Sequence, residues 1–252
     1  MVHEVAQAGF GDAANYEAAR PGYPPDAVAW LVEHLRIRPN RVVVDLAAGT
    51  GKFTRLLIPA GANVIAVEPV AGMREQFRPL LPDTPLLSGT AEAMPFADAS
   101  LDAVTVAQAW HWFDHPRAEA EMRRVVKPGG GFGLVWNARD RSVDWVNEVW
   151  SIMDRVEKKA PWRKHEEWRD SARQIDGFSP MDVAQFFHAQ MLTPEDLVRR
   201  MASVSHVAVL PEQERAVVLH EVREVAATHP ETRGRDQLAV PYRVDCYACT
   251  RL

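Results

Sequence analysis

The sequence has few cysteines, no excess of positive charge and no long apolar run. Its 252 residues include two cysteines, and 29 Lys and Arg stand against 34 Asp and Glu, a formal net charge of −5. Surfaces that bind nucleic acid are normally basic, so we expect no nucleic-acid partner. No apolar stretch has the length of a membrane-spanning helix, and residues 1–10 lack the basic and apolar regions of a signal peptide. These absences favour a cytoplasmic, single-domain protein that acts away from membranes and nucleic acid, and they leave its oligomeric state open.

The two cysteines, Cys246 and Cys249, have the spacing of a redox motif. Such motifs normally begin a helix, whereas the residues around these two are typical of a strand. Side chains three residues apart on a strand point to opposite faces. We therefore expect two structural thiols in a reducing compartment.

The most informative segment is an apolar run that ends in a turn of small residues. Residues 42–46 form a buried strand with Asp45 near its end, residues 47–51 contain Gly49 and Gly51, and a helix-like pattern follows. Glycines in such a turn bring bare backbone close to a ligand at a helix N-terminus. The next strand-like run ends in Glu68, at the distance suited to an acid that binds ribose hydroxyls. This pattern predicts a nucleoside-binding βαβ unit.

The spacing of the glycines distinguishes between two kinds of nucleoside. A dinucleotide fingerprint has a third glycine, and Lys52 stands at that position. Asp45 would repel a pyrophosphate and attract an ammonium group. The segment resembles motif I of the class I S-adenosylmethionine-dependent methyltransferases, with Ala47 in place of the first glycine. The resemblance implies S-adenosylmethionine as cofactor and S-adenosylhomocysteine as product.

Strands and helices alternate along the chain, which indicates a parallel sheet. We expect strands at Val42–Ala47, Val64–Val67, Pro85–Ser88, Leu101–Ala107, Phe132–Trp136, Asp182–Phe187 and Ala239–Thr250. We expect helices at Pro25–Leu35, Gly72–Leu80, Arg117–Val126, Pro194–Met201 and Pro211–Ala227, with Lys127–Gly131 ending the third of them. The resemblance implies a Rossmann-like α/β fold whose seven-stranded, mostly parallel sheet has an antiparallel last strand. One domain would span 1–252, with a leader at 1–24 over the cofactor and an inserted helical cover at 140–178.

The resemblance extends to the segments that follow the second, third and fourth strands. It implies that Glu68 binds the ribose, that Met73 lies against the adenine, and that the segment at 90–92 closes the adenine pocket. Thr90 stands where the family commonly has Asp. The cofactor-binding residues implied in this way are Tyr16, Arg20, Asp45, Ala47, Gly49, Thr50, Gly51, Glu68, Pro69, Met73, Thr90, Ala91, Glu92, Gln108 and Ala109.

Residues 10–25 resemble the leader of small-molecule methyltransferases, including those similar to trans-aconitate methyltransferase. The resemblance implies that Tyr16 covers the site and that Arg20 pairs with the methionyl carboxylate. The alternative is a surface leader that ends in prolines.

The segment after the fourth strand is predicted to face the reacting methyl group, because ligands bind at the carboxyl ends of parallel strands. His111 is our candidate for a general base, and the alternative is a packing histidine. Trp110, Trp112 and Trp145 are candidates for substrate binding, with core packing as the alternative. His111 and His115 form only a weak metal pattern, so we expect no metal.

Two other functions remain open from the sequence. A non-catalytic nucleoside-binding or regulatory protein can have the same fold, since fold does not fix function. An NAD-dependent dehydrogenase is the second alternative.

Overall fold

Seven strands form one sheet in this computed structural model, which describes residues 20–157 and 174–252. The strand order is β3-β2-β1-β4-β5-β7-β6. The strands are β1 Val42–Leu46, β2 Asn63–Val67, β3 Leu86–Leu87, β4 Leu101–Ala107, β5 Val126–Arg139, β6 Asp182–Leu192 and β7 Leu238–Thr250. Strands β1 to β5 pair in parallel, and β7 runs antiparallel to both β5 and β6. The predicted fold class is therefore confirmed.

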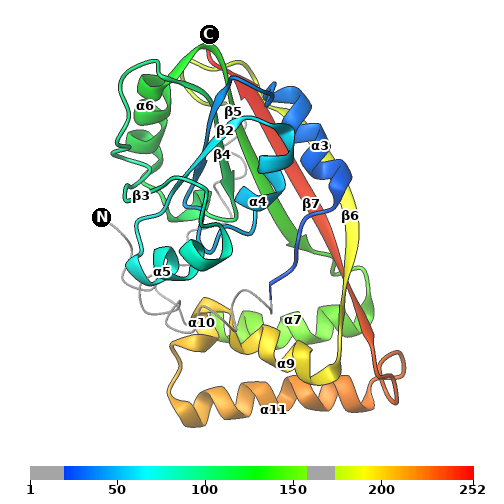
Figure 1. Ribbon diagram of the computed structural model, residues 1–252. Coiled ribbons are helices and arrows are strands. Elements are labelled where there is room, and N and C mark those ends of the chain that lie inside the picture. Colours follow the sequence, from blue (N-terminus) through cyan, green and yellow to red (C-terminus); the bar gives the residue numbers. More distant parts are fainter. Residues whose placement is uncertain (1–19, 158–173) are drawn as a thin grey trace.

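Helices cover both faces of the sheet (Figure 1), so its central strands are buried on both sides. The first of them is α3 Pro25–His34, which packs with the short α4 Thr54–Leu57 and the adjoining turn η1 Ile58–Ala60 around β1 residues such as Val43. Helix α5 Ala71–Leu80 follows β2. Helix α6 His115–Val125, preceded by the 3₁₀ turn η2 Trp110–Trp112, packs its buried Met122 on the other face.

A separate helical layer lies at the end of the molecule toward which β5 runs (Figure 1). It consists of α7 Asp144–Glu157, α9 Pro194–Ala202, α10 Ser205–Ala208 and α11 Glu212–Thr228. Thr193 and Asp196 form a capping box that fixes the start of α9. The helices share a hydrophobic core with the ends of β6 and β7. Helix α7 begins the predicted cover of residues 140–178, of which residues 158–173 lie outside the described chain.

The structure corrects several predicted boundaries. Residues 127–131, which we expected to end the preceding helix, belong to β5. Strand β5 is longer than expected because β4 pairs with it from Val126 to Val135 on one edge and β7 pairs with it from Gly131 to Arg139 on the other. Strand β6 extends to Leu192 because β7 pairs with it over its whole length. Helix α6 begins at His115, where Asp114 caps its first turn. The short helix α10 was not predicted.

Both cysteines are buried free thiols on β7, as predicted. Cys246 packs in the cluster beneath α3, and Cys249 packs in the cluster on the α6 side. They thus point to opposite faces of the sheet. Burial raises the pKa of each thiol to about 12, so neither resembles the low-pKa thiol of a redox centre.

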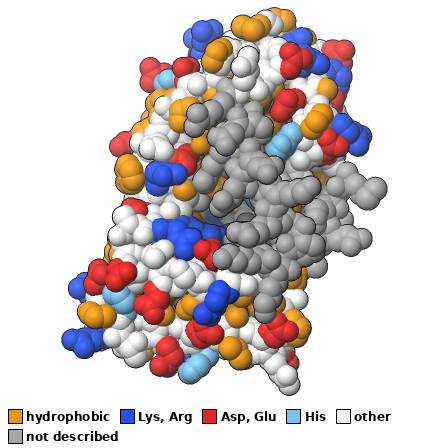
Figure 2. Space-filling view, turned by 180° about the vertical axis from the view of Figure 1, so that it is seen from behind, with side chains coloured by type: hydrophobic (Ala, Val, Ile, Leu, Met, Phe, Trp, Pro, Cys, Tyr) orange, Lys and Arg blue, Asp and Glu red, His pale blue; other side chains and the backbone are white. Residues whose placement is uncertain are grey.

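Acidic and basic side chains are interspersed over the described part of one face of the molecule (Figure 2). Among the residues that the structure describes, no helix combines the length and the apolar character needed to cross a membrane.

Candidate active site

The turn after β1 is built from left-handed backbone conformations. Ala47, Gly49 and Gly51 have φ angles of 55°, 59° and 85°. A Cβ added at Gly49 would meet nothing within 4 Å, whereas one at Gly51 would lie 2.7 Å from the Phe77 ring. Gly51 therefore lets the turn pack against α5, while the space beside Gly49 is open. An open approach to bare backbone is what a bound cofactor requires.

Glu68, at the end of β2, lies directly across from this turn. Its Oε2 atom accepts a hydrogen bond from the Gly49 N–H and its Oε1 atom accepts one from the Val70 N–H, both 2.8 Å long. The side chain is 4% exposed. Burial raises the pKa of Glu68, and the two N–H donors partly oppose that shift. The structure thus brings together Glu68 and Gly49, two residues that the sequence places in one predicted site.

The segment that follows Glu68 is held by Arg74. Its Nη1 atom donates to the carbonyl oxygens of Glu68 and Pro69, at 2.8 and 2.7 Å. Met73 is buried on the same helix, α5. Arg74 therefore holds the backbone at Glu68 and Pro69, while the cofactor contacts of Pro69 and Met73 stay predictions.

We expected the Asp45 carboxylate to face a ligand, whereas in the structure it is buried against two hydroxyl groups. It is 1% exposed, and its carboxylate accepts hydrogen bonds from the Thr54 hydroxyl at 2.6 Å and the Thr105 hydroxyl at 3.3 Å. Burial raises the pKa of Asp45 to about 7. In the ligand-free protein Asp45 joins β1 to β4 and to the start of α4, and its contact with an ammonium group stays a prediction. Its neighbour on the turn, Thr50, is also buried.

The segment at 90–92 lies beside the segment that follows β4. Thr90 and Ala93 form a backbone bridge that encloses the buried Ala91. Glu92 Oε1 accepts a hydrogen bond of 3.0 Å from the Asp114 N–H. The proposed adenine segment and the proposed acceptor segment are therefore joined directly.

His111 stands among aromatic rings at the carboxyl end of β4. Its ring centroid lies 4.6 Å from that of Trp112 and 4.9 Å from that of Trp136, the latter in an edge arrangement. Gln108, at the start of this segment, has a φ of 59°, and the adjacent Ala109 is buried. Trp136 was not singled out in the sequence, although its place at the carboxyl end of a predicted strand was a usable signal.

Trp110 and Trp145 are buried, unlike the half-buried Trp112. The Trp110 ring stacks on that of His115 at 5.2 Å, and His115 Nε2 lies 3.1 Å from the Trp110 carbonyl oxygen. Trp145 packs in the core of the helical layer. These placements match the packing alternative for both tryptophans. Within the described residues no group of three His, Cys, Asp or Glu side chains has a geometry that suits a metal ion.

The end of the leader is tied to two other elements. Lys52 donates a hydrogen bond from Nζ to the Arg20 carbonyl oxygen, and Arg20 Nη2 donates one of 2.8 Å to the Ser203 carbonyl oxygen at the end of α9. Arg20 therefore lies between the turn after β1 and the helical layer. Tyr16 falls outside the described residues, so its predicted role, like the cofactor contact of Arg20, stays a prediction.

Comparison with known proteins gives the family. Residues 44–134 match the model of a methyltransferase domain. An uncharacterised methyltransferase of Mycobacterium tuberculosis is 41% identical over 242 residues, which cover 96% of this chain and 95% of the relative. The fold is similar to that of a candidate type II methyltransferase from Anaeromyxobacter dehalogenans, with a TM-score of 0.66, 23% identity, and 92% and 97% of the two chains covered. A geranyl diphosphate methyltransferase in complex with S-adenosylmethionine gives a TM-score of 0.53 and 16% identity, with 90% and 85% covered.

The match begins within β1 and ends within β5, so it includes the open turn at Gly49, Glu68 and the segment around His111. Open backbone beside a buried acid is the arrangement that a nucleoside cofactor without phosphate needs, and these residues fit that group. The chain belongs to the class I S-adenosylmethionine-dependent methyltransferases.

Proposed function

We propose that this methyltransferase acts on a small-molecule acceptor, with its cofactor held by the turn after β1, Glu68 and the segment at 90–92. The observation that carries the proposal is the convergence of Gly49, Glu68 and the His111 segment at the carboxyl ends of β1, β2 and β4. In a parallel sheet of this kind, ligands bind at those strand ends.

The chain's own residues would divide the cofactor among three places. Glu68 would accept hydrogen bonds from the ribose hydroxyls, since each carboxylate oxygen has a second acceptor site besides its backbone N–H partner. The open backbone at Gly49 and Thr50 would lie along the methionyl portion. Met73 and the segment at 90–92 would enclose the adenine. When bound, S-adenosylmethionine supplies a methyl group that its sulfonium has already activated.

For the reaction itself, the protein must align the acceptor and exclude water. Trp112 and Trp136 flank His111 and supply apolar surface for this purpose. His111 would accept the proton of an O–H or N–H acceptor as the new bond to carbon forms. Trp110 and Trp145 remain substrate-binding candidates, although their burial favours packing.

The finer assignment rests on the leader. We propose that the protein resembles the small-molecule methyltransferases similar to trans-aconitate methyltransferase, in which an aromatic residue and an arginine fold over the cofactor. The position of Arg20 next to Lys52, and thus next to the turn after β1, supports this assignment. The net charge of −5 supports a small-molecule partner, and two buried free thiols are consistent with a cytoplasmic location.

The experiment is turnover of isotope-labelled S-adenosylmethionine against a panel of small metabolites, with S-adenosylhomocysteine measured as product. Glu68→Ala, which is expected to lose cofactor affinity, serves as the inactive comparison, and an exposed acid on α5, Glu75, provides the matched control Glu75→Ala. Cofactor binding without turnover on any acceptor class would instead favour the non-catalytic alternative. The dehydrogenase alternative has lost its support, because the chain belongs to a methyltransferase family.

A further inference from the structure

Helix α9 contains a buried arginine for which the described residues supply no anionic partner. Arg200 is 5% exposed, and its Nε and Nη1 atoms are buried with no hydrogen-bond partner among those residues. Within residues 20–157 and 174–252, no carboxylate forms an ion pair with it. An arginine cannot release its proton, so an unpaired guanidinium in the interior is costly. Such a group points to an anion that is not part of the described protein.

A second guanidinium lies close to the same place. The Cζ atoms of Arg139 and Arg200 lie 3.7 and 5.8 Å from the centroid of the Trp150 ring. Arg139 Nη1 is 3.8 Å from Asp154, but that carboxylate also pairs with Arg141 at 2.7 Å. Arg139 and Arg141 thus share one acid, whereas no carboxylate of the described residues pairs with Arg200.

A buried histidine lies near these arginines. His206, on α10, is buried, and no described residue forms a hydrogen bond with its Nε2 atom. Burial, followed by the charges of Arg139 and Arg20, lowers the pKa of His206 to about 4, while Asp154 acts weakly in the opposite direction. The imidazole is therefore neutral at pH 7. It can form hydrogen bonds, and it leaves the positive charge of the nearby arginines unchanged.

The sheet supplies further polar groups beside the arginines. Arg139 on β5, Tyr242 on β7 and His188 on β6 are directly opposite one another in the strand register. The Tyr242 hydroxyl is buried and has no hydrogen-bond partner in the part of the chain that the structure describes. A guanidinium and a phenol in one row are donors suited to a carboxylate or a phosphate.

This place is within reach of the reacting segment. Strand β4 ends at Ala107 opposite Val135, so the last residues of β5 extend beyond it. Trp136, the first of them, contacts His111. Arg139 follows three residues later, roughly 10 Å along the strand, and its side chain leaves the opposite face of β5. Because β4 does not pair with β5 beyond Val135, a small molecule that lies along this edge can have its reacting atom on one face and its anionic group on the other.

We infer that Arg200 and Arg139 bind an anionic group, a carboxylate or a phosphate, of the methyl acceptor, an assignment that rests on the proposed small-molecule methyltransferase function. Planar guanidinium groups match both kinds of anion. Arg20 adds positive charge from the side of the turn after β1, and the acceptor would be an acid rather than a neutral molecule.

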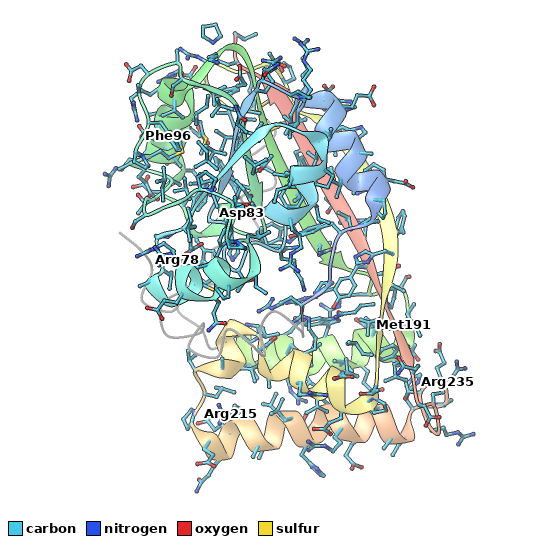
Figure 3. All side chains as sticks on the ribbon, in the orientation of Figure 1. Arg78, Asp83, Phe96, Met191, Arg215 and Arg235 are labelled. Atoms are coloured by element: carbon cyan, nitrogen blue, oxygen red, sulfur yellow. The ribbon has the colours of Figure 1, made fainter. Side chains whose placement is uncertain are left out.

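The first test measures anion binding without methyl transfer. Citrate and inorganic phosphate are titrated into the wild-type protein at constant ionic strength, with glycerol as neutral control, and binding is followed by Tm and calorimetry. Arg200→Gln and Arg139→Gln are expected to weaken anion binding at least about tenfold, the scale of a lost charge-assisted hydrogen bond. The matched control is Arg235→Gln, an exposed arginine in the loop before β7 that points away from the helical layer (Figure 3). No anion response in the wild type, or the same response in Arg200→Gln, overturns the inference.

The second test uses stability. Arg200→Met is expected to raise the Tm of the ligand-free protein, because it replaces an unpaired buried charge with an apolar side chain of similar length. A lower Tm would mean that the guanidinium is already compensated in the free protein, and would count against the site.

The third test separates this inference from the proposed function. Arg200→Gln is expected to raise KM for an acidic acceptor and to leave the Kd of S-adenosylhomocysteine unchanged. A weaker Kd for S-adenosylhomocysteine would assign the anion to the cofactor and overturn the inference. Anion binding without turnover on any acceptor would contradict the proposed function while the anion site stands. If the enzyme methylates neutral acceptors and Arg200→Gln does not change their rate of methylation, the proposed function stands and the anion inference is overturned.

Discussion

The Glu68 carboxylate accepts a hydrogen bond of 2.8 Å from the backbone N–H of Gly49, so the acid that ends β2 orders the turn that follows β1. The two halves of the proposed cofactor site are thus connected by a direct hydrogen bond. A change at Glu68 should consequently affect both ribose binding and the conformation of the turn.

We predict that Glu68→Ala weakens the binding of S-adenosylhomocysteine by roughly 1.5–3 kcal/mol, the scale of hydrogen bonds to a charged group. It should also lower stability, because the N–H groups of Gly49 and Val70 lose their acceptor. Calorimetry measures the affinity and thermal unfolding the stability, with Glu75→Ala as control. A folded Glu68→Ala variant with the wild-type Kd would rule out the ribose assignment.

We predict that alanine at Gly49 and alanine at Gly51 have different effects. Both sites have positive φ, which costs a residue with a Cβ about 1–2 kcal/mol. At Gly49 the added methyl enters open space, so cofactor affinity should fall while the fold survives, and Gly49→Val should abolish binding. At Gly51 the methyl would meet Phe77, so stability should fall further by about 1–3 kcal/mol. Kd and Tm for the two variants, measured side by side, check this; equal Kd values for Gly49→Ala and the wild type would contradict it.

We predict that His111→Ala lowers the methylation rate more than it weakens cofactor binding. A lost general base costs ~10²–10⁴-fold in rate, whereas the cofactor would be held chiefly by the turn after β1, Glu68 and the segment at 90–92. Single-turnover rates of the variant and a pH–rate profile of the wild type are the measurements. If His111 is the general base, the wild-type profile should show a histidine-like ionisation that is lost in His111→Ala.

The control for this prediction is the exposed His34 on α3, and His34→Ala should keep the wild-type rate. A His111→Ala variant with wild-type turnover would return His111 to the packing histidines. A slow variant whose rate has no histidine-like pH dependence would make it a positioning residue.

We predict that Asp45→Asn changes how stability depends on pH. The pKa of Asp45 is about 7 in the folded protein against 3.8 in the unfolded chain, so the folded state binds an extra proton between these values. Stability must therefore fall as pH rises from about 4 to 7, by up to on the order of 4 kcal/mol, and stay level above. Denaturant unfolding at pH 4 to 8 should show this loss in the wild type and a smaller one in Asp45→Asn. The control Asp26→Asn, which changes an exposed acid on α3, should lose as much stability over this pH range as the wild type. If Asp45→Asn also loses as much stability as the wild type, the pH dependence comes from groups other than Asp45.

The local parts of this protein could be predicted from the sequence. The turn between two buried strands, and the acid that ends the second, are close in the chain, and strand and turn chemistry depends on near neighbours. The pairing of Glu68 with Gly49 follows from such a unit. The strand order followed from resemblance to a family, and the boundaries of β5 and β6 were wrong because pairing with β7 lengthened them.

Only the tertiary structure decided which distant residues meet. The Asp45 carboxylate accepts a hydrogen bond from Thr105, and Trp136 contacts His111. The guanidinium groups of Arg200 and Arg139 both lie near the Trp150 ring. Burial decides whether an arginine is a solvated surface charge or a binding group, and burial arises when separate elements pack together. The sequence determined that this chain has a site for a nucleoside cofactor, whereas the packing of α10 against α7 and α9 decided that Arg200 is buried with no carboxylate partner among the described residues.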